Sequence, residues 1–461
     1  MARSIARTTA PRVALAGIFA LFAAGYFLSY SFRSIGPLIA PDLMRELSLN
    51  AADLGLLASV YFLTFALAQP FIGIGMDRYG PARVNAVLFV FAAAGALVFA
   101  FGHSFAGLGL GRALIGLGVS GALMAGMTAF VVWFPQQHRE SLTIALSAVG
   151  GLAAMIVSIP AELAMRVIGW RGLVLTLGAA SLAVAILLWW RIGAGPAKAG
   201  AGAMATGSPE AAGAPSGDAM QTGSQSQSQT VSVEYPEARG FGDIFASRLF
   251  RAYVPLALFG SGGYSAVQSL WAGPWLVEVE GHTRAGAAHV LFIYALALFT
   301  SYLAVAWLSA RLRTIPGAAR RLYAGALGFV FCAFGLIVLN PWPQSSVPWF
   351  LYGIATGAIM LAYPVLTRAF PAAIAGRVVT AYNVVMFVGA FLIQWGIGLL
   401  IQRLIDGGSA KAQAYQISFG VLCTAQLASL LWFWFGTRAC ALNQHAPAAA
   451  QAVNPPSRPT A

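Results

Sequence analysis

The sequence predicts an all-α membrane protein in which twelve transmembrane helices form two bundles of six. Three observations lead to this fold class. Hydrophobic residues make up 59% of the 461-residue chain and charged residues only 9%, whereas soluble domains carry about 25% charged residues. The apolar residues fall into twelve runs that approach or exceed the roughly 20 residues a bilayer-spanning helix needs. A polar stretch divides the runs into six and six.

The first half of the chain holds six of these runs. We assign residues 1–192 to an N-terminal six-helix bundle. Its runs fall near residues 13–40, 53–75, 84–103, 105–133, 141–165 and 170–191.

The composition changes abruptly after the sixth run. We predict that residues 193–247 are a flexible cytoplasmic linker, because residues 193–240 are rich in Gly, Ala, Ser and Gln, which cannot form a core. Residues 248–437 are predicted to form the C-terminal bundle, and residues 438–461, rich in Ala and Pro, a disordered cytoplasmic tail. The second set of runs falls near residues 248–279, 285–310, 319–340, 346–370, 377–404 and 412–437.

The basic residues indicate how the helices are oriented. The net charge is +13, but the Arg residues stand in short loops rather than in one solvated patch, so we expect no nucleic-acid binding. Lys and Arg gather on the cytoplasmic side of membrane proteins. With the N-terminus inside, cytoplasmic segments hold Arg78, Arg83, Arg139, Arg191, Arg248, Arg251, Arg311, Arg313, Arg320, Arg321 and Arg377. Opposite loops hold Arg45, Arg166, Arg171, Arg284, Arg403 and Lys411. We expect a multi-pass inner-membrane protein with both termini in the cytoplasm.

Signals for catalysis and for bound groups are missing from the sequence. Cys332, Cys423 and Cys440 form no CxxC pair, so we expect packing roles and no metal. The chain has no nucleotide-binding loop, which argues against ATP-driven transport. We expect no enzymatic activity, no cofactor, and a monomer in the lipid bilayer.

The loop after the second run carries the most specific motif. It reads Gly73-Ile-Gly-Met-Asp77-Arg78-Tyr-Gly80-Pro-Ala-Arg83 and resembles the GxxxDRxGRR signature of the major facilitator superfamily. The resemblance implies two bundles around a central site that is exposed to each side in turn. It also implies that this loop is a latch that closes the cytoplasmic side.

Each residue of the motif has a physical reason. Gly73 allows two helices to approach closely, and Gly80 permits a tight turn. Asp77 is expected to face the N-terminus of a helix in the other bundle, where the helix dipole favours an anion. Arg78 and Arg83 are expected to hold the loop at the cytoplasmic face.

Arg112 belongs to a second motif of the same family. The segment Arg112-Ala-Leu-Ile-Gly116 matches its RxxxG pattern, and the resemblance implies a role in conformational or proton coupling. An Arg inside a membrane helix is costly. The alternative is a structural Arg that donates hydrogen bonds to helix carbonyls.

Arg33 lies inside the first predicted span. The segment around it is similar to the first helix of the organophosphate:phosphate antiporters, whose substrate-binding Arg falls on Arg33, and of the related anion:cation symporters. A guanidinium suits a carboxylate or a phosphate. Those antiporters carry a further Arg near Ser265 and a Lys at Gln69, which this chain lacks. One cation favours a small organic anion such as a monocarboxylate or sugar acid over a phosphate ester.

Other polar and aromatic residues are candidates to complete the site, although each also fits a packing role. They are Tyr30, Gln69, Tyr264, Gln268, Trp271, Asn383 and Gln394. The candidates for proton coupling are Asp42, Glu162 and His289. For Glu162 the alternative is an exposed residue beside Arg166.

The leading hypothesis is a secondary active transporter that moves a small organic anion, coupled to protons. One alternative is an efflux antiporter for apolar compounds. It is disfavoured because the fifth run has Gly150-Gly151 early but lacks the Gly-Pro and later glycine pair of drug antiporters. The other alternative is a membrane sensor of the same fold that does not transport.

Overall fold

The computed structural model describes residues 12–192, 241–311, 318–368, 370 and 374–453. Within these ranges the regular secondary structure is entirely helical. Most of the predicted linker, residues 193–240, lies outside the described residues.

The N-terminal half contains the six predicted spans, some of them built from two helices. The sixth span continues directly from the fifth inside α8, with a kink at Gly169, whose φ is +68°. The helices are α1 (Arg12–Ser34), α2 (Gly36–Leu47), α3 (Ala51–Tyr79), α4 (Pro81–Phe101), α5 (Phe105–Val119), α6 (Ala122–Trp133), α7 (Gln136–Ile156) and α8 (Ile159–Arg191).

The C-terminal half contains the other six spans. Ten helices of the described residues are long and apolar enough to cross a membrane, and the seventh and tenth predicted spans are divided into shorter segments. The elements are α10 (Phe241–Ala246), α11 (Arg248–Pro255), η1 (Leu256–Gly262), α12 (Gly263–Ala266), η2 (Val267–Trp271), α13 (Ala272–Glu278), α14 (Arg284–Arg311), α15 (Ala318–Leu339), α16 (Val347–Thr356), η3 (Gly357–Leu361), α17 (Ala362–Arg368), α18 (Ala375–Asp406) and α19 (Lys411–Val453).

Two boundaries differ from the sequence-based assignment. Helix α10 lies inside the predicted linker, residues 193–247. Helix α19 continues to Val453, past residue 438, where the tail was expected to begin. Ala has the highest helix propensity, and the segment after Arg438 is rich in Ala, so the helix extends into it.

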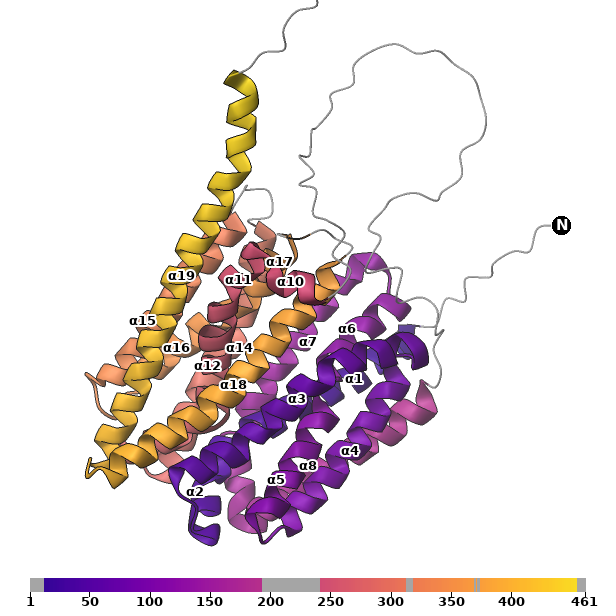
Figure 1. Ribbon diagram of the computed structural model, residues 1–461. Coiled ribbons are helices and arrows are strands. Elements are labelled where there is room, and N and C mark those ends of the chain that lie inside the picture. The colour runs from indigo at the N-terminus through magenta and orange to yellow at the C-terminus, as the bar shows by residue number, and fades with distance from the viewer. Residues whose placement is uncertain (1–11, 193–240, 312–317, 369, 371–373, 454–461) are drawn as a thin grey trace, which may run out of the picture.

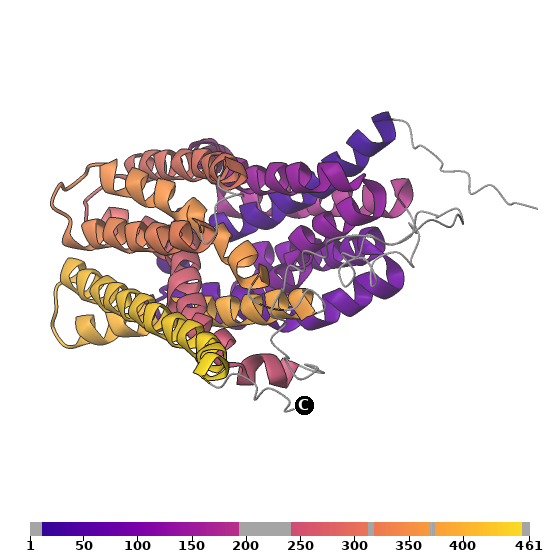
Figure 2. The ribbon, with the colours of Figure 1, turned by 90° about the horizontal axis from the view of Figure 1, so that it is seen from above.

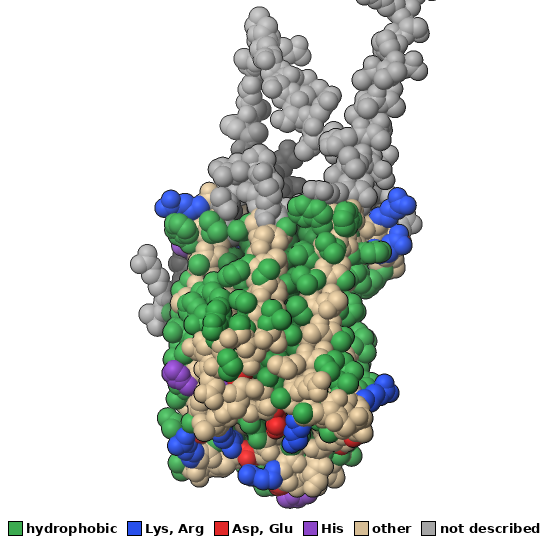
Figure 3. Space-filling model, turned by 90° about the vertical axis from the view of Figure 1, so that its left-hand side faces the viewer, with side chains coloured by type: hydrophobic (Ala, Val, Ile, Leu, Met, Phe, Trp, Pro, Cys, Tyr) green, Lys and Arg blue, Asp and Glu red, His purple; other side chains and the backbone are tan. Residues whose placement is uncertain are grey.

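The two halves lie side by side (Figures 1 and 2). Helix α3 packs along α18, and α7 packs along α14, so these four helices join the halves. Figure 3 shows a broad hydrophobic flank, with charged side chains gathered towards the two ends of the molecule. We call the end that holds α2, the start of α14 and the α18–α19 connection the α2 end.

A break in the first span places the central residues. Helix α1 ends at Ser34 and α2 begins at Gly36, followed by Pro37. Proline has no N–H to continue the helical hydrogen bonds. Broken helices inside a membrane are tolerated where protein surrounds them or where they line a cavity. The break leaves Arg33 in the last turn of α1.

The halves are in close contact at the α2 end. A Cβ atom added to Gly273 of α13 would overlap the backbone of Pro37, and one added to Gly36 would overlap the carbonyl of Ser269. The backbone N–H of Ala51 also donates to Gln402 Oε1 at 3.3 Å. The two halves therefore touch backbone to backbone at this end.

Glu46 connects helix α2 to α8 of the same bundle through hydrogen bonds. The carboxylate accepts hydrogen bonds from Trp170 Nε1 at 3.1 Å and Arg171 Nη1 at 2.6 Å. The bond from Arg171 holds the pKa of Glu46 below its ordinary value. A lowered carboxyl pKa stabilises the fold above the pKa of the unfolded chain, and this contribution is lost as the pH falls through the folded value.

Candidate functional site

Arg33 lies between the two bundles, enclosed by aromatic rings. Its guanidinium carbon is 5.6 Å from the ring centroid of Tyr30, 5.4 Å from that of Phe65 on α3 and 5.3 Å from that of Phe387 on α18. The phenols of Tyr26 and Tyr61 also neighbour the guanidinium. Residues of both bundles therefore surround one positive charge.

Among the described residues, this charge has no carboxylate partner. No ion pair in the described residues includes Arg33, and its buried Nε has no hydrogen-bond acceptor there. Burial of an Arg at the membrane centre costs at least about 2.5–3.5 kcal/mol, and cation–π contacts offset part of that cost. The arrangement leaves guanidinium N–H groups available to an anion.

Tyr30 and Gln268 connect the bundles beside Arg33. Gln268 Nε2 donates to the Tyr30 hydroxyl oxygen at 2.9 Å, and that hydroxyl lies 3.3 Å from Gln268 Oε1. Tyr264 is nearby, and its buried hydroxyl has no hydrogen-bond partner among the described residues. The structure thus brings together Arg33, Tyr30 and Gln268, whereas the ring of Tyr264 packs against that of Tyr352.

The remaining predicted binding residues are engaged elsewhere. Trp271 is fully buried and donates from Nε1 to the carbonyl of Gln394 at 2.9 Å. Asn383 Oδ1 accepts from the Tyr363 hydroxyl at 2.7 Å. Gln69 donates to the carbonyl of Ser120, at the break between α5 and α6, at 3.1 Å. These bonds connect helices within one bundle.

The loop of the predicted latch joins α3 to α4. Asp77, Arg78 and Arg83 are exposed, and no ion pair of the described residues includes Asp77. Gly80 has a φ of +82° and joins α3 directly to α4, which explains the glycine. A Cβ atom at Gly73 would meet open space. The role of this loop as a latch stays a prediction.

Arg112 contacts the break in the first span. It is 5% exposed, and its Nη1 donates to the carbonyl of Phe32 at 3.4 Å. Its guanidinium carbon lies 5.2 Å from the ring centroid of Phe99. This geometry corresponds to the structural alternative, an Arg bound to a helix carbonyl. Arg112 is thus bonded to the residue that precedes Arg33 in the chain.

The three proton-coupling candidates lie in different surroundings. Glu162 is 5% exposed and accepts from Arg166 Nε at 2.9 Å, so it is beside Arg166 but buried. His289 is exposed on α14. Asp42 is buried and pairs with Arg45 at 2.9 Å and with Arg284 at 2.7 Å.

The pair between Asp42 and Arg284 connects the bundles at the α2 end. Arg284 donates from Nη1 to Asp42 Oδ1 at 3.2 Å and from Nη2 to Oδ2 at 2.7 Å. It also donates to the carbonyl of Leu38 at 3.2 Å. Such two-pronged contacts are among the stronger ionic hydrogen bonds.

Glu280 is a buried carboxylate that the sequence did not single out. Its Oε1 accepts from Trp275 Nε1 at 3.0 Å and from Trp349 Nε1 at 2.9 Å, and its Oε2 lies 3.3 Å from His282 Nε2. Trp275, five residues earlier in the chain, was the one local signal. Glu280 anchors the short connection that precedes Arg284.

We expect Glu280→Ala to lower the thermal stability of the protein. The change leaves two buried indole N–H groups without an acceptor, at roughly 1–3 kcal/mol for each. Glu280→Gln is the matched control, because its amide oxygen can still accept both bonds. Melting of detergent-solubilised protein, followed by size-exclusion chromatography, measures the difference. Equal melting temperatures for the two variants would contradict this role.

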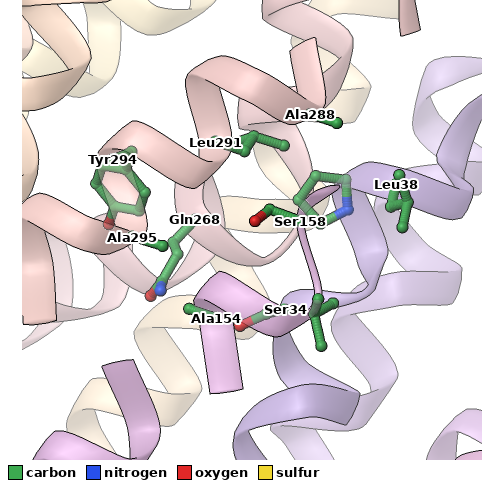
Figure 4. A pocket seen from close by; sticks show the side chains of 11 residues that line it. Ser34, Leu38, Ala154, Ser158, Gln268, Ala288, Leu291, Tyr294 and Ala295 are labelled. Atoms are coloured by element: carbon green, nitrogen blue, oxygen red, sulfur yellow. The ribbon is translucent and has the colours of Figure 1, made fainter. Parts of the chain in front are cut away.

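Two cavities lie between the central residues and the α2 end. The smaller, of about 30 Å³, is lined by residues from α1, α2, α7, the connection between α7 and α8, and α14, with Gln268 from η2 (Figure 4). The larger, of about 110 Å³, has Arg284 in its wall.

Comparison with protein families gives one match over most of the chain. The model of the Major Facilitator Superfamily matches residues 21–394. Among solved structures, a bacterial homolog to the human lysosomal transporter Spinster, in an inward-facing and occupied conformation, has a TM-score of 0.66. It is 18% identical, and the match covers 92% of this chain and 97% of that one.

Curated proteins match over shorter segments. A probable sulfoacetate transporter of Cupriavidus necator is 28% identical over 165 residues, 35% of this chain and 38% of that protein. A nitrate/nitrite transporter of Picosynechococcus is 32% identical over 110 residues, 24% of this chain and 20% of the relative. A quinolone resistance protein of Staphylococcus aureus is 29% identical over 112 residues. The match covers 24% of this chain and 29% of that protein. The chain therefore spans less than two fifths of each of these relatives.

Proposed function

The chain belongs to the major facilitator superfamily, and from this premise we propose that it is a secondary active transporter that moves a small organic anion, coupled to protons, by alternating access. The observation that carries the proposal is Arg33, a positive charge between the two bundles without a carboxylate partner in the described residues. An anion would supply the partner that the described residues do not.

The surroundings of Arg33 favour a singly charged ligand. One guanidinium, phenol hydroxyls and the Gln268 amide offer a single positive charge and several neutral hydrogen-bonding groups. A phosphate ester carries close to two negative charges at neutral pH, which one Arg leaves partly unpaired. Two relatives are named for sulfoacetate and for nitrate or nitrite, and this supports an anion as the substrate class.

We assign the α2 end to the outer face of the inner membrane. The distribution of Lys and Arg along the chain supports this orientation, and both the linker and the C-terminus are then cytoplasmic. The close contacts at the α2 end fit a conformation that is closed to the outside. The test is a reporter enzyme that is active only in the cytoplasm. Fused within residues 193–240, this reporter should be active.

A panel of ligands tests the substrate class. Purified protein is screened by thermal shift against sulfoacetate, nitrate, monocarboxylates, sugar acids, phosphate esters and a quinolone. We expect stabilisation by one or more of the singly charged anions, and then exchange of that anion in proteoliposomes, with net uptake increased by an inward proton gradient. Stabilisation by the quinolone alone would favour efflux of apolar compounds, and binding without exchange would favour a sensor.

A further inference from the structure

Arg284 is placed to exchange one anionic partner for another. Asp42 is shared between Arg284, of the opposite bundle, and Arg45, of its own helix. If the bundles part at the α2 end, Asp42 keeps Arg45. Arg284 has no second carboxylate within ion-pair distance in the described part of the chain. When the bundles part at the α2 end, the Arg284 guanidinium therefore has no anionic partner among the described residues.

The position of Arg284 is both supported and accessible. The connection before it is anchored by Glu280 through two indole N–H groups. Its side chain is 39% exposed, so a solute at this end of the molecule reaches it. On its inner side Arg284 forms part of the wall of the cavity of about 110 Å³, whose other walls, such as Pro41, Val277 and Ala287, are apolar.

The two cavities lead from Arg284 towards Arg33. They share four wall residues, Pro37, Leu38, Ala288 and Leu291. The smaller cavity also reaches Ser34, Ser158 and Gln268, as Figure 4 shows. Gln268 is hydrogen-bonded to Tyr30, whose ring lies against the Arg33 guanidinium. The smaller cavity thus has four residues with hydrogen-bonding side chains among mostly apolar ones, and the larger cavity has a cation, Arg284, in its wall.

We propose that Arg284 is a second anion-binding residue, which receives the same small organic anion at the outer mouth of the pathway. The proposal rests on the proposed function. Two oxygens of an arriving carboxylate or sulfonate replace the two oxygens of Asp42 on the Arg284 fork, because the guanidinium can bind either pair in a two-pronged contact. Asp42 turns fully to Arg45, the bundles part, and the anion moves along the cavities to Arg33.

Neutral variants of Arg284 and Asp42 distinguish an anion-binding site from an ion pair that only closes the outer end. The assay is counterflow, which needs no proton gradient, of the anion identified by the panel, with acetate, a monocarboxylate, as the first probe. We expect Arg284→Gln to raise the KM at least tenfold. Asp42→Asn should leave the KM unchanged or lower it, since it removes the competitor for Arg284. A pair that only closes the outer end gives both variants the same change.

The controls keep the outcomes distinct. Arg403→Gln neutralises another exposed Arg at the same end of the C-terminal bundle and should leave the KM unchanged. Arg284→Lys keeps the charge without the fork and should raise the KM less than Gln does; it replaces Arg284→Gln if that variant does not fold. Equal KM shifts in Asp42→Asn and Arg284→Gln, or no shift in either Arg284 variant, would overturn the inference. Absence of counterflow by the wild type for every anion of the panel would instead reject the proposed function.

Discussion

Replacing Arg33 by glutamine is expected to abolish anion binding while the protein still folds. Hydrogen bonds between charged groups contribute about 1.5–3 kcal/mol each, so loss of a two-pronged contact weakens binding by roughly 100-fold or more. The wild-type protein holds Arg33 without a carboxylate partner in the described residues. We therefore expect the melting temperature without ligand to be unchanged or higher. Thermal shift with the anion of the panel measures both effects.

The conservative variant sharpens this test. Arg33→Lys should restore binding only in part, because an ammonium keeps the charge but not the planar fork. Arg403→Gln, which removes a charge outside the site, should bind as the wild type does. Unchanged affinity in Arg33→Gln would make Arg33 a structural residue, and the assignment of an organic anion would lose its main support.

Gly273→Val is expected to reduce transport by at least a hundredfold. A side chain at residue 273 collides with the backbone of Pro37, across the contact between α13 and α2, so the α2 end cannot close. A transporter that cannot close one side cannot complete its cycle. Gly325→Val on α15 is the matched control, because a Cβ atom there meets open space. Uptake into proteoliposomes gives the rates.

Labelling of a cysteine reports the closure directly. Val277 lines the cavity behind this contact, and Val277→Cys is introduced after Cys332, Cys423 and Cys440 are replaced by serine. We expect a membrane-impermeant maleimide to label this cysteine slowly in the Gly273 background and rapidly with Gly273→Val. Equal labelling rates would mean that the α2 end does not close in the way the structure indicates.

The course of the chain through the fold was largely predictable from its sequence. A bilayer requires about 20 apolar residues per helix, so composition alone locates the spans to within a few residues. The break between Ser34 and Gly36 and the subdivision of residues 248–278 depend on contacts with neighbouring helices. Hydropathy averaged along a span does not record those contacts.

The central site was predictable only in part. Arg33 was found because a charge within an apolar run demands an explanation. Trp271 and Gln394 were plausible ligands by residue type, but they bond to each other's helices, and one helix sequence does not specify which neighbour a side chain meets. From the sequence, Arg284 contributes only to the prediction of membrane topology. Its partner Asp42 lies 242 positions away in the chain, beyond the reach of any local pattern.

The uncompensated charge of Arg33 has an electrical consequence. As the empty protein changes the side to which its site is open, the membrane field acts on one positive charge, whereas a bound monoanion makes the site neutral. A full elementary charge gains or loses about 2.3 kcal/mol per 100 mV, and a partial passage through the field proportionally less. Membrane voltage should therefore bias the return of the empty carrier and leave exchange of loaded sites nearly unaffected.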